Sequence, residues 1–246
     1  KYGGVHADFR YNCIVNEEIA RSGCSGLGWT LHSDIAVPYI ERYGTEYQKE
    51  KYLSRCVSGE LITAIAMSEP GAGSDLQGTK TNAVLDGDHY ILNGSKTFIT
   101  NGQKSGLVIV VAKTDVSAGS KGISLFLVES EFEGFSKGKN LEKLGMKAQD
   151  TSELFFQDVR VPKENLLGEE GRGFIYLMQD LPQERLSIAV GAIANAQALL
   201  ESTIDYTKER KAFGVSVASF QNTQFKLAEL SAEISSAEVF LDRCTE

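Results

Sequence analysis

The stretch Ala66–Asp75, Ala-Met-Ser-Glu-Pro-Gly-Ala-Gly-Ser-Asp, is rich in glycine and hydroxyl side chains, a composition that suits close binding of a ligand. Pro70 followed by Gly71 and Gly73 gives backbone without bulky side chains, so a ligand can approach the peptide groups. The alternative is an ordinary surface turn, because a single glycine-rich loop is weak evidence. The stretch lies where a helix-patterned N-terminal part gives way to a strand-patterned middle part.

Other residue types that often carry chemistry form no recognisable group. The histidines, His6, His32 and His89, are scattered and indicate neither a Ser-His-Asp triad nor a histidine metal site. The four cysteines lack Cys-x-x-Cys spacing, so we predict no metal site and expect reduced thiols in an intracellular protein. A formal net charge of −8 without a Lys/Arg-rich run argues against nucleic acid and anionic membranes as partners. The longest apolar runs, such as Leu107–Ala112, are too short to span a bilayer.

The first sixty residues are expected to be mostly helical. Asp8 can cap a helix that ends near Gly23. A second helical pattern covers Trp29–Arg42 and is bent by Pro38. Thr45–Gln48 then reads as a capping box that opens a third helix.

From Leu61 the hydrophobic period changes to that of strands. Thr81–Leu85 and His89–Asn93 alternate around Asp86-Gly87-Asp88, which predicts a hairpin. Further strands are expected at Leu61–Met67, Thr97–Thr100, Leu107–Lys113, Ile123–Val128 and Glu153–Val161. Short strands at this spacing, with no helical pattern between them, predict an antiparallel sandwich or barrel.

After Gly173 the pattern is helical again. One helix is expected to reach Arg210, and a second, which Ser219 can cap, carries an apolar seam that starts at Leu227. The sequence therefore predicts an α+β protein in three parts: a helical N-terminal domain (1–61, partial), a central antiparallel β-barrel or sandwich (62–170), and a helical C-terminal bundle (171–246, partial). Neither end resembles a natural terminus, so we expect the chain to be a truncated fragment.

Three collinear motifs resemble the flavin-binding segments of acyl-CoA dehydrogenases. They are Ala66–Asp75, Leu92–Gly102, and Arg210–Gly214 with Gln221 downstream. The similarity extends along essentially the whole chain. Within the family, the sequence most resembles the long-chain acyl-CoA dehydrogenase branch, at Gly122–Glu129, Gly145–Thr151 and Leu181–Leu186.

The resemblance implies an oxidoreductase of fatty acid β-oxidation that uses FAD to convert an acyl-CoA, expected to be long-chain, to the trans-2-enoyl-CoA. It also implies electron-transfer flavoprotein as the electron acceptor and a homotetramer built as a dimer of dimers. The location would be the mitochondrial matrix in a eukaryote or the cytoplasm in a bacterium. The alternatives are an acyl-CoA oxidase, a dehydrogenase of another acyl thioester, and a family-like scaffold without chemistry.

The reaction needs a carboxylate that removes the α-proton while the β-hydrogen leaves as hydride to N5 of FAD. Most family members have this base near the C-terminus, whereas the long-chain and isovaleryl branches have it at the position of Glu184. Leu181, Pro182 and Leu186 give Glu184 an apolar setting that suits a base. The alternative is a first-turn glutamate favoured by the helix dipole.

The resemblance also implies the residues that bind the cofactor and the substrate. The cofactor residues are Ile65, Met67, Ser68, Gly73, Ser74, Phe98, Ile99, Thr100, Arg210 and Gln221. The substrate residues are Ser74, Ile175, Pro182, Gln183 and Arg185. Phe98 stands where many relatives carry Trp, and its alternative is a core aromatic of the barrel. Arg210 suits pyrophosphate through its planar fork, although it can also be a helix C-terminal cation.

Overall fold

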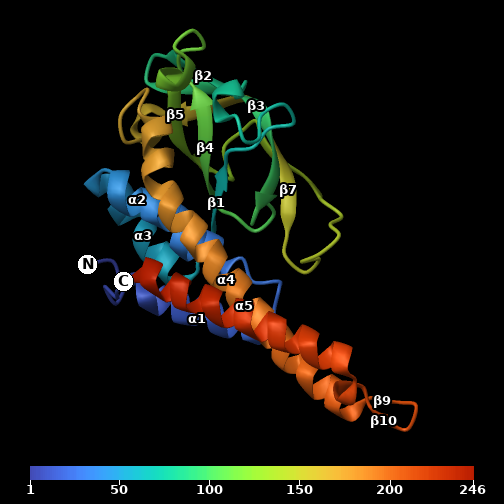
Figure 1. Cartoon of the computed structure of the whole chain (residues 1–246). Helices are drawn as coiled ribbons and strands as arrows, with labels where there is room; N and C mark the ends of the chain where they lie inside the picture. Colours follow the sequence, from blue (N-terminus) through green and yellow to red (C-terminus); the bar gives the residue numbers. More distant parts are fainter. The chain divides into compact units, whose positions relative to one another are not determined.

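The computed structural model describes all residues, 1–246, and they form two compact units. Residues Lys1–His6 and Gly26–Gln183 make up the sheet unit, and residues Ala7–Ser25 and Glu184–Glu246 make up the helical unit. Figure 1 shows the helices and strands of both units. The order of helices, then strands, then helices agrees with the expected fold class. The three domain boundaries given above stay a prediction.

The sheet unit contains an eight-stranded sheet in the order β6-β7-β3-β2-β4-β5-β8, with β1 paired to β4. Most pairs are antiparallel, whereas β1 and β2 pair with β4 in parallel. The strands are β1 (Thr63–Ala66), β2 (Asn82–Asp86), β3 (His89–Thr100), β4 (Leu107–Lys113), β5 (Ile123–Glu129), β6 (Phe135–Asn140), β7 (Thr151–Pro162) and β8 (Leu166–Leu167). The expected strand Thr97–Thr100 is the end of β3, and the polar strand β6 lacks the apolar alternation that would have predicted it.

Strand β4 is buried on both faces, which explains its unbroken apolar sequence. Leu107, Ile109 and Val111 belong to one core with residues of helices α2 (Val37–Tyr43) and α3 (Glu46–Ser58). Val108 and Val110 point the other way, into a second core formed by strands. Helices α2 and α3 therefore cover one face of the sheet, whereas the other face packs against side chains of the sheet's own strands.

The predicted capping box is present at the start of α3: the Thr45 hydroxyl accepts from Gln48 N, and Gln48 Oε1 accepts from Thr45 N. Before α2, residues Leu31–Ala36 form a wider π-helical turn. This turn carries His32, whose ring links three segments. Its Nδ1 accepts from Thr63 N at 3.0 Å, so the ring proton is on Nε2, which lies 3.1 Å from Cys56 O.

We expect acid to destabilise the protein partly through His32. Burial lowers the pKa of this histidine, although the hydrogen bond to the Cys56 carbonyl opposes the shift. The unfolded chain then binds more protons below the ordinary pKa of about 6.5, so the stabilising contribution is present above that pH and is lost as the pH falls. His32→Gln should flatten the dependence of the urea midpoint on pH between about 5 and 7. An unchanged slope would show that another group causes the acid sensitivity.

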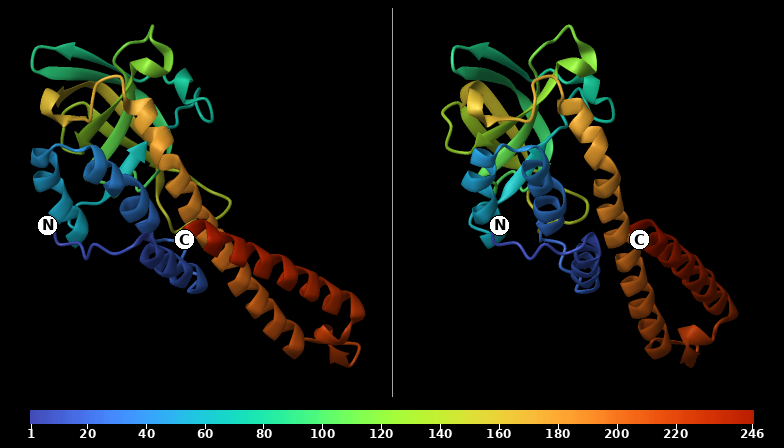
Figure 2. Two further views of the ribbon diagram at one scale, coloured as in Figure 1. Left: turned by 60° about the vertical axis from the view of Figure 1, so that its left-hand side comes forward. Right: turned by 90° about the vertical axis from the view of Figure 1, so that its left-hand side faces the viewer.

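The helical unit consists of α1 (Phe9–Arg21), the part of α4 (Gly173–Glu209) that follows Gln183, and α5 (Gln221–Thr245). A small hairpin of β9 (Lys211–Ala212) and β10 (Val215–Ser216) joins α4 to α5, as both views in Figure 2 show. Cys13, Val190 and Leu241 form the core of this unit. Asp8 caps α1 as predicted.

The expected cap of α5 is wrong. A short 3₁₀ turn, Val217–Ser219, precedes the helix, and the Ser219 hydroxyl donates to Ser216 O. The N-cap residue is therefore Phe220, which has no side-chain cap hydrogen bond.

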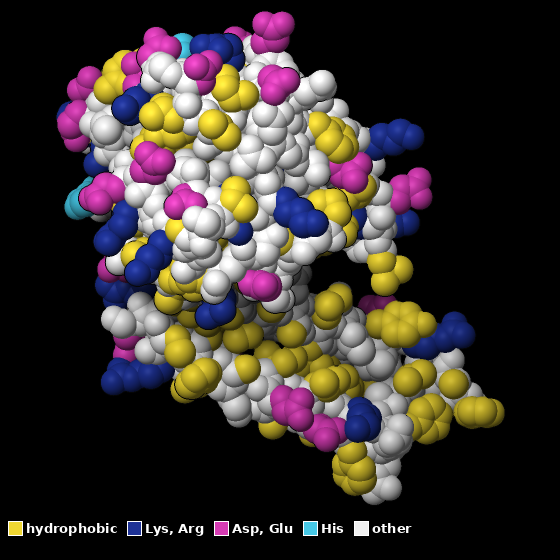
Figure 3. Space-filling model, turned by 90° about the horizontal axis from the view of Figure 1, so that it is seen from above, with side chains coloured by type: hydrophobic (Ala, Val, Ile, Leu, Met, Phe, Trp, Pro, Cys, Tyr) yellow, Lys and Arg dark blue, Asp and Glu magenta, His cyan; other side chains and the backbone are white.

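Many large apolar side chains of the helical unit are exposed, and Figure 3 shows apolar side chains among charged ones on one face of the molecule. They include Leu199, Phe213, Phe225, Leu230, Val239 and Phe240. Of the expected seam on α5, only Leu241 is buried. None of the helices has both the length and the apolar character that a membrane span requires.

Candidate active site

The predicted cofactor segments of the sheet unit meet where β3 leaves its neighbour β7. The register between these strands shifts between Lys96 and Ile99. There the Thr97 N–H donates to Ser68 O at 2.9 Å, which joins β3 to the loop that follows β1. Two motifs that are separate in the sequence therefore lie side by side.

The register shift turns Phe98 outward. Lys96 and Thr97 are both buried, which breaks the alternation of the strand, and Phe98 then adopts a left-handed backbone with φ of 58°. Its side chain is 70% exposed, so it is not a core aromatic of the barrel. An exposed aromatic ring in a strained conformation is a candidate for stacking on a planar ligand.

Replacing Phe98 by Asn should separate binding from stability. A left-handed backbone at a bulky residue costs about 1–3 kcal/mol, and Asn tolerates this region better than Phe does. We expect Phe98→Asn to stabilise the cofactor-free protein by up to about 1 kcal/mol and to weaken FAD binding about tenfold. Urea unfolding and FAD titration measure the two effects, with Phe98→Tyr as the control that keeps the ring. Unchanged FAD affinity in the Asn variant would exclude a stacking role.

The other residues of the two segments can contribute different groups. The Ile99 side chain is buried in the strand core, so only its backbone is available to a ligand. Ile65 is likewise buried, whereas Met67, Ser68 and Thr100 are half-buried. Gly73 and Ser74 are exposed. These groups fit a flavin, because they combine an aromatic face with hydroxyls and backbone donors that carry no net charge.

A buried ion pair holds the loop and the strand together. Lys96 is fully buried, and its Nζ donates to Met67 O at 3.0 Å and to Glu69 Oε1 at 2.9 Å. The Glu69 carboxylate also accepts from the backbone N–H groups of Lys80 and Thr81. The sequence patterns did not predict this ion pair. The available signal was one acidic residue, Glu69, in the motif Ala66–Asp75 and one basic residue, Lys96, in the motif Leu92–Gly102.

The pair is electrostatically coupled. Burial lowers the pKa of Lys96 to about 8, and the hydrogen bond to Glu69 limits the drop. Burial opposes ionisation of Glu69, but the hydrogen bonds from Lys96 and Thr81 outweigh it and hold the pKa of this carboxyl below its ordinary value. At neutral pH both groups are therefore charged.

Asn101 fixes the other end of the segment Thr97–Thr100, in which the register against β7 shifts (the Phe98 bulge). It is buried with φ of 61°, and its Nδ2 donates to the carbonyl oxygens of Gly28 and Thr63. A side chain on Gly28 would overlap Asn101, since an added Cβ would lie 1.8 Å from Asn101 Oδ1. Lys96 and Asn101 thus bracket the segment Thr97–Thr100 with buried polar contacts.

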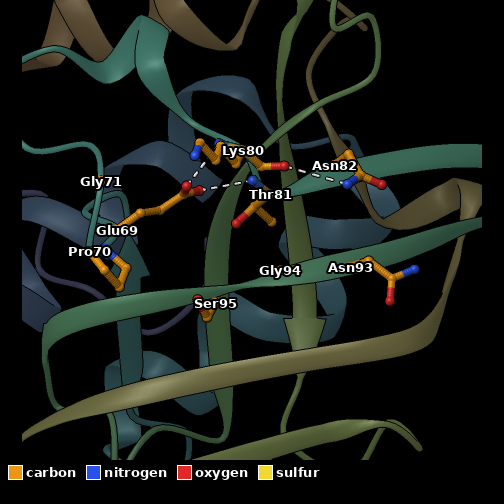
Figure 4. A pocket seen from close by; sticks show the side chains of 9 residues that line it. All are labelled: Glu69, Pro70, Gly71, Lys80, Thr81, Asn82, Asn93, Gly94 and Ser95. Atoms are coloured by element: carbon orange, nitrogen blue, oxygen red, sulfur yellow. Dashed lines mark hydrogen bonds between the residues drawn. The ribbon is translucent and has the colours of Figure 1, made fainter.

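A pocket of about 540 Å³ lies next to these segments (Figure 4). It is lined by Glu69, Pro70, Gly71, Lys80, Thr81, Asn82, Asn93, Gly94 and Ser95. In Figure 4 the Glu69 side chain extends from its loop toward the backbone of Lys80 and Thr81. None of the residues assigned to the flavin lines this pocket, so it is not the predicted cofactor site.

Glu184 lies in the interior of α4, which begins at Gly173. The alternative of a first-turn glutamate held by the helix dipole is therefore excluded, because that effect is confined to the first turn. Its side chain is in a buried position, with 7% of the residue exposed. Pro182 lies inside the same helix, where it cannot donate a backbone hydrogen bond.

Of the substrate residues in the sheet unit, Ile175 is partly exposed. Gln183 is engaged by the protein itself, because its Oε1 accepts from Arg42 at 2.7 Å and its Nε2 donates to Asp34 O at 3.1 Å. Arg42 also contacts the buried Asp180 carboxylate. These contacts fix the turn of α4 that comes directly before Glu184.

The remaining predicted residues belong to the helical unit. Arg210 follows the last residue of α4 and is exposed, and its N–H donates to Tyr206 O. Gln221 is the first residue of α5 and is also exposed, as is Arg185 in α4. Both roles considered for Arg210 are compatible with this place at a helix C-terminus.

Three family models together account for nearly all of the chain. The acyl-CoA dehydrogenase N-terminal domain matches residues 1–60, the middle domain matches residues 64–159, and the C-terminal domain matches residues 171–246. The middle-domain match contains both motifs that meet at the Phe98 bulge.

Individual relatives agree with these models. The long-chain specific acyl-CoA dehydrogenase of mouse mitochondria is 56% identical over the whole chain, which spans 58% of that protein. The crystal structure of an acyl-CoA dehydrogenase from Geobacillus kaustophilus is 55% identical with a TM-score of 0.97, over 98% of this chain and 64% of that one. The structure of an acyl-CoA dehydrogenase complexed with FAD from Bacillus anthracis is 37% identical with a TM-score of 0.92, over 98% of this chain and 41% of that one.

Proposed function

Because the chain belongs to the acyl-CoA dehydrogenase family, we propose that the complete protein oxidises an acyl-CoA to the trans-2-enoyl-CoA with FAD as its cofactor. The observation that carries this proposal is the hydrogen bond from Thr97 N–H to Ser68 O, which joins the glycine-rich loop to β3 directly before the outward-facing Phe98. A relative of the same fold was solved in complex with FAD. The mouse relative, whose name specifies long-chain substrates, favours a long-chain acyl group.

The FAD site would use the residues of both motifs. Phe98 would stack on the ring system, and the Ser68 and Thr100 hydroxyls and nearby backbone groups would donate to its polar edge. Gly73 and Ser74 leave the loop open for close approach, since an added Cβ at Gly71 or Gly73 would meet no atom within 4 Å. Arg210 and Gln221 would contact a second copy's cofactor in a homotetramer. When bound, FAD supplies the oxidant that takes the β-hydrogen as hydride.

Glu184 would act as the base that takes the α-proton. Its burial favours this role, because a carboxylate shielded from water is a stronger proton acceptor than a solvated one. The resemblance assigns Ser74, Ile175, Pro182, Gln183 and Arg185 to the binding of the acyl thioester. The contacts of Gln183 with Arg42 and Asp34 make this turn rigid, which favours a defined position of the base.

The electrons would pass to electron-transfer flavoprotein, and the protein would work in the mitochondrial matrix if it is eukaryotic or in the cytoplasm if it is bacterial. The mouse relative is mitochondrial. A solved structure described as the electron transferring flavoprotein of Acidaminococcus fermentans also resembles this chain, with 40% identity and a TM-score of 0.94 over 99% of this chain and 64% of that one.

Bleaching of the flavin absorbance by acyl-CoA tests the proposal. The complete protein, purified with FAD, should be bleached by saturated acyl-CoA thioesters, and the rate across a series of chain lengths should identify the preferred substrate. Turnover with an electron-acceptor dye should exceed oxygen consumption. Dominant peroxide production would instead indicate an acyl-CoA oxidase, and no bleaching by any thioester would indicate a scaffold.

A further inference from the structure

The buried ammonium group of Lys96 contacts a peptide group of the glycine-rich loop, and this peptide group would face the cofactor. The Met67 carbonyl accepts a hydrogen bond from Lys96 Nζ. The chain has no cis peptide bonds, so the carbonyl and the N–H of the Met67–Ser68 peptide point in opposite directions. Since the carbonyl points to the buried ammonium, the Ser68 N–H points away from it.

The Ser68 N–H donates to no acceptor within the chain, whereas the Ser68 carbonyl is occupied by Thr97 N–H. An ammonium bound to a carbonyl oxygen polarises the peptide and strengthens its N–H as a donor. The free donor lies in the loop that is joined to the Phe98 bulge. It is therefore available to the polar edge of a ring that stacks on Phe98.

We propose that Lys96 is a positioning residue for the flavin: it orients and polarises the Met67–Ser68 peptide so that the Ser68 N–H donates to the cofactor, while Glu69 neutralises the buried charge. This inference rests on the proposed function, because it assumes that the loop binds FAD. If the side chain at position 96 served only to fill the protein interior, an apolar residue would be sufficient there. The ammonium instead contacts one peptide oxygen of the binding loop and one carboxylate that is itself anchored by two backbone N–H groups.

The experiment measures the midpoint potential of the flavin in the complete, FAD-loaded protein. Lys96→Met removes the positive charge and leaves Glu69, so it should lower the potential and make the flavin harder to reduce. Glu69→Gln removes the negative charge and should raise the potential when it is measured at a pH low enough to keep Lys96 protonated, because Glu69 no longer supports the pKa of the lysine. The double variant removes both charges, so its potential should lie between those of the two single variants. Lys163→Met, which removes an exposed lysine of the same unit, is the matched control and should leave the potential unchanged.

The sign of the shifts distinguishes tuning from packing. Opposite shifts in the two single variants, with a changed flavin absorbance spectrum in Lys96→Met, would support the proposal. Wild-type potentials in Glu69→Gln and in the double variant would overturn it, even if Lys96→Met failed to fold. A complete protein that binds no FAD would instead overturn the proposed function, which keeps the two failures distinct.

Discussion

Replacing Glu184 by Gln is expected to slow flavin bleaching by acyl-CoA about 10²–10⁴-fold or more, because the amide cannot take the α-proton. The substitution keeps the size of the side chain and its buried position in α4. FAD content and the visible spectrum of the oxidised flavin should therefore stay as in the wild type. Stopped-flow measurement of bleaching with a saturating acyl-CoA gives the rate.

Two comparisons make this prediction specific. Glu201→Gln changes an exposed glutamate later in the same helix and should leave the rate unchanged. Binding of an enoyl-CoA product, followed by its effect on the flavin spectrum, should be retained in Glu184→Gln, because product binding needs no base. Bleaching of the Gln variant at the wild-type rate would show that the base is another carboxylate.

Loss of Lys96 should be the most destabilising single substitution at the candidate site. Lys96→Met leaves Glu69 as a buried carboxylate without its cation, and breaking a buried pair in this way costs about 3–5 kcal/mol. The Met67 carbonyl also loses its donor. Urea unfolding of the complete cofactor-free protein, compared with the wild type, measures the loss.

The double variant Lys96→Met with Glu69→Gln should be more stable than Lys96→Met alone, because no charge then stays buried. Gln can accept only part of the hydrogen bonds that Glu69 receives from Lys80 and Thr81, so recovery should be incomplete. A loss below about 1 kcal/mol in Lys96→Met would mean that the Glu69 carboxyl reaches water or becomes protonated.

The sequence predicted the fold well where local chemistry decides it. The Thr45 capping box, the Asp8 cap and the turn between β2 and β3 all depend on neighbouring residues, and the structure has each of them. Ser219 failed as a cap because the chain makes an additional 3₁₀ turn there. Strand β6 was missed because its Ser, Lys, Gly and Asn residues show no apolar alternation.

The candidate site was only partly predictable. The motifs identified the loop and the Phe98 segment, but the outward turn of Phe98 depends on a register shift against β7, a strand more than fifty residues away in the sequence. The Lys96–Glu69 pair is likewise a long-range contact, and buried charges are rare enough that local pattern does not predict them. The interior position of Glu184 in α4 follows from a helix start at Gly173, which the apolar periodicity placed only approximately.

The register shift at Thr97–Phe98 also fixes the length of the chain between the two buried anchors, Lys96 and Asn101. Side chains of a strand alternate between faces, so removing one residue there would exchange the faces of Ile99 and Thr100. A hydroxyl would enter the apolar core, and an isoleucine would replace it at the surface that the ligand would meet. The spacing of this segment is therefore as much a part of the site as the identity of its residues, and insertions or deletions are better accommodated in the exposed turn Asp115–Ser117.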